Sequence, residues 1–344
     1  MAYLWAMAIV VVKKLEDRRR YHLRLIILTL VAYVVGGWFL YQNDALHFLF
    51  IGTDTKIETD VSPFPISVNP QAKTISDDPE LDAFITSEIV SNYTPPRQAQ
   101  SLLAIVIEEI FTNHIFQQLA SPISRTLVIY SGQRTEEISD AFAKILRWNN
   151  EEKATFETLA ASFPPSYAEG VLYPGRYYVE RDSGPELIIQ NISARFDETV
   201  RSRYTPEIEA VLPLADALII ASLIEREANN FTNMREISGV IWNRLFIDMP
   251  LQLDATLQYV RGENPGEPWW PVPRPADKFL DSPYNTYKNK GLPPAPIANP
   301  SIDAITAALN PINTDCIFYF HTPDGSFFCS VTYEDHVRKL REQF

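Results

Sequence analysis

Apolar residues recur at helical spacing in several parts of the chain, and this pattern predicts most of its regular structure. Residues 97–119 and 234–246 carry apolar side chains at intervals of three and four, as expected for helices with one buried face. Residues 215–229 are apolar on nearly every side, which predicts a helix enclosed by the core. Further helices are expected at residues 78–92 and 302–309, and from Thr135 and Tyr333 onward.

Short runs rich in β-branched and aromatic residues predict a smaller number of strands. One is expected at residues 126–130, and two more at 316–321 and 326–331, joined by a Pro-Asp-Gly hairpin turn. This mixture of helices and short strands indicates an α+β fold. A hydrophobic content of 46% is sufficient to fill a sizeable core.

The N-terminal part of the chain has the pattern of a transmembrane anchor. Residues 25–41 carry no charge, and a helix of that length covers about 26 Å, close to the ~30 Å core of a bilayer. Lysines and arginines cluster before this run, so residues 1–24 are expected in the cytoplasm and the chain from residue 42 onward outside. The alternatives are a cleaved signal peptide and a buried core helix. Because no small-residue cleavage site follows Tyr41, we expect a retained anchor.

Charge and residue usage exclude several classes of protein. A formal net charge of -13 argues against a nucleic acid partner, which is bound through clustered lysines and arginines. The histidines are scattered without an HExxH motif, and the two cysteines form no CxxC pair. We therefore expect neither a metal nor another cofactor.

Cys316 and Cys329 lie on the two arms of the expected hairpin. Direct pairing requires the register that sets Phe320 opposite Gly325. A shift by two residues would separate the thiols beyond the ~7 Å Cα distance that a disulfide tolerates. Cysteine is also a common buried apolar residue, so two buried thiols are the favoured expectation and a disulfide is the alternative.

The enclosed helix at residues 215–229 ends in charged residues, which makes it the most informative segment. Glu225 lies at the edge of the predicted core, and the small residue Ser222 on its face predicts that it borders a cleft. Glu227 points in another direction, so the two carboxylates are not expected to act as a pair. In the alternative interpretation Glu225 closes the core through a salt bridge to Arg226, Arg235 or Arg244.

Several polar residues after this helix are candidates for binding a sugar. Their hydroxyl, amide and carboxylate groups are suited to hydrogen bonding with sugar hydroxyls, although the same residue types are common in ordinary loops. The candidates are Asn243, Asp254, Thr256, Tyr284, Asn285 and Thr286.

Four blocks of sequence, in this order, resemble the endolytic murein transglycosylases of the MltG/YceG-like family. The blocks are ASLIERE at 221–227, IWNRL at 241–245 with MPLQLDAT at 249–256, SPYNTY at 282–287, and GLPP with IANP at 291–294 and 297–300. The chain departs from the family pattern at Asp254-Ala255-Thr256, where Asp-Pro-Thr is common, and at His336-Val337, where a His-Asn pair is usual.

The resemblance implies that Glu225 is catalytic. It implies non-hydrolytic cleavage of the β-1,4 bond between N-acetylmuramic acid and N-acetylglucosamine in peptidoglycan, which leaves 1,6-anhydromuramoyl ends. One carboxylate suffices for this reaction, whereas a water-using glycosidase normally needs two, ~5–5.5 Å or ~6.5–9.5 Å apart. Two alternatives remain, a hydrolase with Asp254 as second carboxylate and a non-catalytic glycan-binding scaffold of the wall-synthesis machinery.

The expected organisation combines the residue patterns with the resemblance. The domains are a basic cytoplasmic N-terminus at 1–24, a transmembrane anchor at 25–41, a juxtamembrane region at 42–125, a LysM-like α/β module at 126–168 and a mixed α+β catalytic domain at 169–344. From composition alone the module is either a spacer or a carbohydrate-binding unit. The expected partners are glycan strands and the plasma membrane, with a peptidoglycan synthase complex as a further candidate. The catalytic domain is then extracytoplasmic, where the enzyme would terminate nascent strands.

Overall fold

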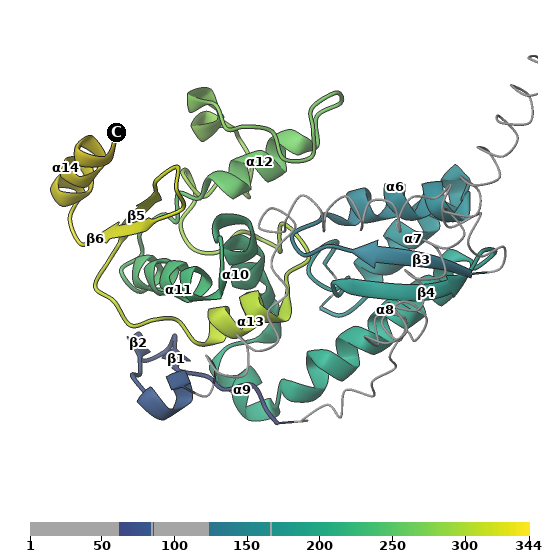
Figure 1. Cartoon of the computed structure of the whole chain (residues 1–344), viewed down its shortest axis with the longest axis horizontal. Coiled ribbons are helices and arrows are strands. Elements are labelled where there is room, and N and C mark those ends of the chain that lie inside the picture. The colour runs from purple at the N-terminus through teal and green to yellow at the C-terminus, as the bar shows by residue number, and fades with distance from the viewer. Residues whose placement is uncertain (1–61, 84, 86–123, 166) are drawn as a thin grey trace, which may run out of the picture. The chain divides into compact units, whose positions relative to one another are not determined.

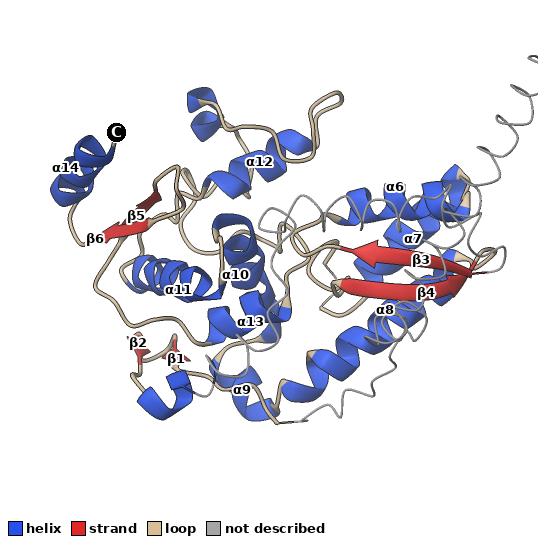
Figure 2. Cartoon of the chain, viewed as in Figure 1, coloured by secondary structure: helices blue, strands red, loops and turns tan. Residues whose placement is uncertain are grey.

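The computed structural model describes residues 62–344 apart from residue 84, residues 86–123 and residue 166 (Figure 1). The expected anchor at 25–41, the expected helix at 97–119 and most of that at 78–92 lie outside the described residues. Within the described part, no helix is both long and apolar enough to cross a membrane. Helices predominate there, with three small two-stranded sheets, so the expected α+β class is confirmed (Figure 2).

A strand, two helices and a second strand form a βααβ unit. β3 (Ser124–Ile129) precedes α6 (Thr135–Leu146) and α7 (Asn150–Ser162), and β4 (Gly175–Glu180) pairs antiparallel with β3. Alternate residues of β3 are buried, as expected for a strand in a sheet with one covered face. Asn149 caps α7 by accepting hydrogen bonds from the first backbone N–H groups of that helix.

The core of this unit extends further along the chain than the expected module. Tyr177 of β4 is buried in the same cluster as Phe142 of α6, and α8 (Pro185–Thr199) adds Ile188. The expected boundary at residue 168 therefore falls between the two paired strands. Sequence periodicity did not predict β4 as a strand, because its segment is dominated by aromatic and turn residues.

A helical core follows, with α10 enclosed by its neighbours. Its elements are η2 (Arg201–Arg203), α9 (Pro206–Val211), α10 (Leu214–Glu227), α11 (Phe231–Phe246), α12 (Asp254–Gly262), η3 (Pro275–Phe279) and α13 (Ile302–Leu309). Every α10 residue from Ala217 to Ile224 is buried, and α11 and α13 both pack against this helix (Figure 1). The all-round apolar pattern therefore predicted its environment correctly.

A short N-terminal segment packs on the helical core. It contains β1 (Val68–Asn69) and β2 (Thr74–Ile75), which pair antiparallel. Phe64 and Val68 are buried in the cluster that also contains α10. The backbone N–H of Ser67 donates to the carbonyl of Leu309 at 3.1 Å, which joins this segment to the end of α13.

The C-terminal part is a hairpin followed by a helix. β5 (Phe318–His321) pairs antiparallel with β6 (Phe327–Ser330), and α14 (Tyr333–Gln343) ends the chain. Both strands and the helix were expected, and Thr332 caps α14 through the backbone N–H of Asp335.

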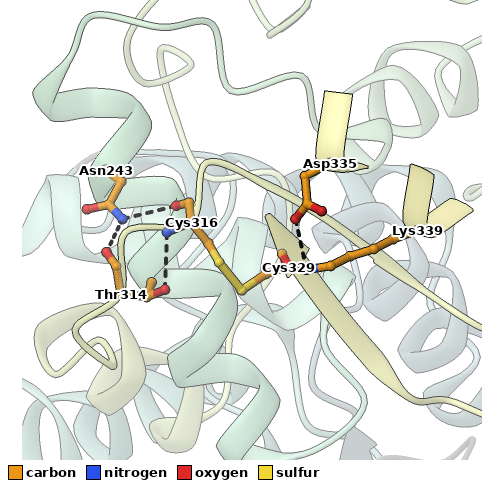
Figure 3. The surroundings of a disulfide bond; sticks show 6 residues. All are labelled: Asn243, Thr314, Cys316, Cys329, Asp335 and Lys339. Atoms are coloured by element: carbon orange, nitrogen blue, oxygen red, sulfur yellow. Dashed lines mark hydrogen bonds and ion pairs between the residues drawn. A yellow bond between two sulfur atoms is a disulfide. The ribbon is translucent and has the colours of Figure 1, made fainter. Parts of the chain in front are cut away.

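Cys316 and Cys329 form a disulfide with a Cα–Cα distance of 5.7 Å (Figure 3). The expectation of two buried thiols is therefore wrong, and the observed register is neither of the two that were considered. Cys329 lies opposite Tyr319, and Cys316 precedes the first residue of β5. The path of the chain before that strand therefore sets the position of Cys316 relative to β6, and the pairing of the two strands does not.

Candidate active site

The last turn of α10 carries three charged residues in a row, and each meets a different part of the molecule. The helix is buried up to Ile224, whereas Glu225, Arg226 and Glu227 are only partly buried. Successive helical positions are about 100° apart, so the three side chains leave the helix in different directions. The end of α10 thus presents two separate carboxylates.

Glu225 contacts the N-terminus of α13. Its Oε2 accepts hydrogen bonds from the backbone N–H of Ser301 at 2.9 Å and from the Ser301 hydroxyl at 2.5 Å. Ser301 is also the N-cap of α13, since its Oγ accepts from the backbone N–H of Ala304 at 3.2 Å. Among the described residues, the hydrogen bonds to Glu225 reach only Oε2.

A second carboxylate lies in the electrostatic field of Glu225. Burial raises the pKa of Asp303 to about 7, and the charge of Glu225 contributes to the same shift. Burial also raises the pKa of Tyr173 to about 12, with Asp303 among the charges that act on it. Glu225 and Asp303 therefore form an acidic cluster, in which burial favours the neutral form of Asp303.

Arg226 joins this helix end to the βααβ unit. Its guanidinium lies over the Trp270 ring, 3.7 Å from the centroid, and Nη1 donates to the carbonyl of Gly132 at 3.3 Å. The Trp270 indole N–H donates to Glu137 of α6 at 3.1 Å. Gly132 has a φ of +77°, and a Cβ atom there would meet the Arg226 side chain at 3.2 Å. Glycine is therefore favoured here, because another residue would be strained at this positive φ and would crowd the Arg226 side chain.

The same turn is docked on the loop that precedes α13. The Gly132 N–H donates to the carbonyl of Asn299 at 2.8 Å, and the Asn299 N–H donates to the carbonyl of Gln133 at 2.9 Å. The Asn299 side chain is buried and donates to Glu169 at 3.0 Å. Burial raises the pKa of the Glu169 carboxyl well above its usual range, while Thr135 donates two hydrogen bonds to it. These contacts hold the loop that leads to Ser301.

Glu227 is held on the other side of the helix. Its Oε1 accepts from the backbone N–H of Ala255 at 3.3 Å, and its Oε2 accepts from the Tyr319 hydroxyl at 3.0 Å. Burial raises the pKa of Glu227 and raises that of Tyr319 well above the usual tyrosine range. The expectation that the two glutamates do not share a face agrees with these contacts.

The arginines proposed as structural partners of Glu225 are engaged elsewhere. Arg235 pairs with Asp82, and its Nε donates to the carbonyl of Asn310 at 2.8 Å. Arg244 donates to the carbonyl of Ile317 at 2.6 Å. Among the described residues no ion pair involves Glu225, so the salt-bridge alternative is not supported.

Ser222, the small residue from which a cleft beside Glu225 was predicted, is itself covered by a loop. Ser222 is fully buried, its hydroxyl donates to the carbonyl of Ile219, and it accepts the backbone N–H of Ile297 at 3.0 Å. Loop residues therefore cover this part of the helix face. The pattern of small residues reflected close packing of a loop on the helix.

Three of the predicted sugar-binding residues are buried within a loop framework. Thr256 and Thr286 lie 3.0 Å apart between their hydroxyl oxygens, and Thr286 also accepts the backbone N–H of Leu253. The fully buried Asn285 donates to the carbonyl of Leu280 at 2.8 Å. Their polar groups thus join the loop at 282–287 to the start of α12.

The other predicted residues are more accessible. Asp254 is exposed and accepts the Tyr287 hydroxyl at 2.7 Å, while the half-buried Tyr284 packs on Tyr259 with ring centroids 4.9 Å apart. Asn243 contacts none of these residues through its hydrogen bonds. Its amide donates to the carbonyls of Thr314 and Cys316 beside the disulfide (Figure 3). The structure therefore groups five of the six residues around α12 and the 282–287 loop, on the Glu227 side of the site.

Sequence reasoning missed Ser301, Asp303, Trp270 and Tyr319. Ser301 directly precedes an expected helix, so it could have been predicted as an N-cap. Its contact with Glu225 spans 76 positions in the chain, and no local pattern predicts such an approach. Within the described residues, no group of His, Cys, Asp and Glu is arranged to hold a metal ion.

Fold and site together define an α+β protein with an acidic cluster at the end of a buried helix. Residues 106–342 match the model of the YceG-like family, and the chain belongs to that family. A YceG-like protein of Listeria monocytogenes, known from a crystal structure, is 30% identical with a TM-score of 0.54, over 62% of this chain and 75% of that one.

Two curated relatives bear the name endolytic murein transglycosylase. The protein of Streptococcus pneumoniae serotype 2 is 28% identical over 265 residues, which are 75% of this chain and 48% of the relative. That of Bacillus subtilis is 33% identical over 177 residues, which are 51% of this chain and 48% of the relative. The chain thus spans about half the length of the curated relatives that it matches.

Proposed function

We propose that this protein is an endolytic lytic transglycosylase of peptidoglycan, with Glu225 as its catalytic acid and base. The observation that carries the proposal is the Glu225 carboxylate, which two donors hold at Oε2, while no hydrogen bond from a described residue reaches Oε1. Relatives named endolytic murein transglycosylases support the choice of substrate. Such cleavage would terminate nascent glycan strands.

The reaction uses one carboxylate in two successive roles. Glu225 first protonates the glycosidic oxygen that leaves the muramoyl anomeric carbon. The ionised carboxylate then accepts the proton of the muramoyl 6-hydroxyl as that oxygen attacks the same carbon, which closes the 1,6-anhydro ring. No water is consumed, so a second carboxylate to activate water is not needed.

The predicted sugar-binding residues would act in two ways. The exposed Asp254 and the half-buried Tyr284 offer groups that can reach a glycan. The buried Thr256, Asn285 and Thr286 would shape the loop that presents them. Asn243 would hold the segment at 314–316 beneath the hairpin.

The βααβ unit would be a LysM-like module that holds the glycan strand next to Glu225. Its turn at Gly132 contacts the end of α10, so a strand lying along the unit would reach the acid directly. The exposed Tyr178 on β4 offers an aromatic ring for stacking on a sugar.

A digest of purified sacculi by the full chain in detergent tests the proposed reaction. Mass spectrometry should find 1,6-anhydromuramoyl ends, and these should be absent with the Glu225→Gln variant. Products heavier by ~18 Da would identify a hydrolase. Binding without any cleavage would identify a glycan-binding scaffold.

The proposed location is the plasma membrane, with an anchor at residues 25–41 and the catalytic domain outside the cytoplasm. The Cys316–Cys329 bond supports this, because disulfides persist mainly in oxidising compartments. A peptidoglycan synthase complex would be a neighbour there. A reporter that works only outside the cytoplasm should be active when it is fused to the C-terminus. Activity of a reporter that works only in the cytoplasm, fused at the same place, would contradict the topology.

A further inference from the structure

Ser301 makes two hydrogen bonds to one oxygen of the proposed catalytic acid. Its backbone N–H lies 2.9 Å from Glu225 Oε2, and its hydroxyl lies 2.5 Å from the same atom. The hydroxyl also serves as the N-cap of α13, since it accepts the Ala304 N–H. Because the Ser301 hydroxyl oxygen accepts the Ala304 N–H through a lone pair, the hydroxyl proton is free to be donated to Glu225.

The position of Ser301 is itself held by the fold. Asn299, two residues earlier, is bonded through its backbone to Gln133 and Gly132 of the βααβ unit. Its side-chain Oδ1 accepts the N–H groups of Gly170 and Leu172, both at 2.9 Å. Ser301 therefore projects from a loop tied to the βααβ unit on one side and to α13 on the other.

We propose that Ser301 is a positioning residue that anchors Oε2 of Glu225 and so assigns the exchangeable proton to Oε1. This inference rests on the proposed function, in which Glu225 is the acid. In the protonated form Oε2 is the carbonyl-like oxygen and still accepts both hydrogen bonds. In the ionised form the same two donors stabilise the negative charge. The Ser301 contacts thus persist through both steps of the reaction while the orientation of the carboxyl stays constant.

Other charges surround this contact and must be considered in any test. The charge of Glu225 contributes to the raised pKa of Asp303 on α13. Arg226 lies on the same helix as Glu225, and Glu137 of α6 acts on that arginine. These groups are left unchanged in the variants below, so any difference between variants reports on the Ser301 side chain.

The test compares kcat, KM and the pH profile of kcat for full-length Ser301→Ala, Ser301→Thr and wild-type protein in detergent. The alanine variant should lose about 10-fold or more in kcat, the scale of one hydrogen bond to a charged group, with little change in KM. Its pH profile should move, because a donor to the acid is gone. Ser301→Thr restores a hydroxyl and should recover most of the rate.

Thr332→Ala is the matched control, since it removes another helix N-cap far from Glu225 in the contact network. It should keep the wild-type rate and pH profile. If Ser301→Ala does not fold, Ser301→Asp keeps a good N-cap but replaces the donor by a carboxylate, and it should fold and be inactive. Wild-type kcat in Ser301→Ala, with Glu225→Gln inactive, would overturn the positioning role while leaving the proposed function intact.

A double-mutant cycle on thermal unfolding tests the contact independently of activity. The cycle uses Ser301→Ala and Glu225→Ala, alone and combined, so that loss of the α13 cap cancels between backgrounds. The combined variant should be more stable than additivity predicts, with a difference of a few degrees in Tm. Strict additivity of the two substitutions would overturn the proposed contact, whatever the activity of the protein. Absence of anhydro ends from digested sacculi would overturn the proposed function but not the contact.

Discussion

Two glutamates at the end of one helix have opposite surroundings. Glu225 meets the N-terminus of α13 and keeps one oxygen free among the described residues. Glu227 meets the N-terminus of α12 and the Tyr319 hydroxyl, and both of its oxygens accept hydrogen bonds. Both residues are glutamates on α10, and they differ only in the groups that surround them.

Under the proposed function, this difference separates a carboxyl that exchanges a proton with the substrate from one that supports the fold. A general acid must reach its substrate, so it needs an oxygen that the protein does not occupy. Glu227 instead joins α10 to α12 and to β5, which belongs to the disulfide-bonded hairpin. The following four predictions test whether the two sides of the helix end are functionally distinct.

The largest expected effect is on the Glu225 side. Glu225→Gln should fold normally, because the amide oxygen can still accept from Ser301, but it should lose glycan cleavage by at least ~10²-fold. The release of anhydro ends from sacculi measures the loss. Unchanged turnover in a well-folded variant would remove Glu225 from the mechanism.

The next effect concerns the hairpin that supports Glu227. Replacing both Cys316 and Cys329 by serine should lower the free energy of unfolding by about 3 kcal/mol in the chain-entropy model, given the sequence separation of 13. Urea unfolding with and without reductant measures this change. Cleavage well below the unfolding transition should stay near wild type, and equal stability of the two proteins would contradict the prediction.

A smaller, pH-dependent effect is expected at Asp303. Its pKa of about 7 exceeds the ordinary value of 3.8, so between these pH values the folded state binds more protons than the unfolded state. Its contribution to stability therefore falls as pH rises through this window. Asp303→Asn removes this loss of stability. The free energy of unfolding of the variant relative to wild type should therefore rise by roughly 2 kcal/mol between pH 4 and pH 7.5, after allowance for partial exposure. Thermal unfolding at pH 4 and pH 7.5 tests this, and a constant difference would refute it.

The smallest effect on catalysis is expected at Glu227. Glu227→Gln should reduce cleavage by less than ~10-fold, because the side chain leaves the helix away from Glu225. Burial raises the pKa of Glu227, so its contribution to stability also falls with rising pH above the ordinary value. The Tm of the variant relative to wild type should therefore rise with pH. A loss of cleavage as large as that of Glu225→Gln would end the distinction between the two sides.

Local patterns predicted the elements that depend on local sequence. The helix at Ile302–Leu309 was predicted with these bounds, and the enclosed α10 was predicted from its all-round apolar pattern. β4 and α8 were not predicted, because an aromatic strand and a helix of weak amphipathicity have little periodic signal. The disulfide was judged from ladder register and from the tendency of cysteine to be buried, and the register argument failed because Cys316 precedes the strand.

The sequence by itself determined the α+β class, the burial of α10 and the presence of Glu225 at its end. These follow from apolar spacing and from family-like blocks, both of which are properties of contiguous residues. Only the tertiary structure decided which oxygens of the two carboxyls accept hydrogen bonds, since the donors Ser301 and Tyr319 lie far from α10 in the chain. Hydrogen bonding and desolvation act through space, so the two glutamates of one helical turn acquire different chemistry only after α12, α13 and the hairpin pack around them.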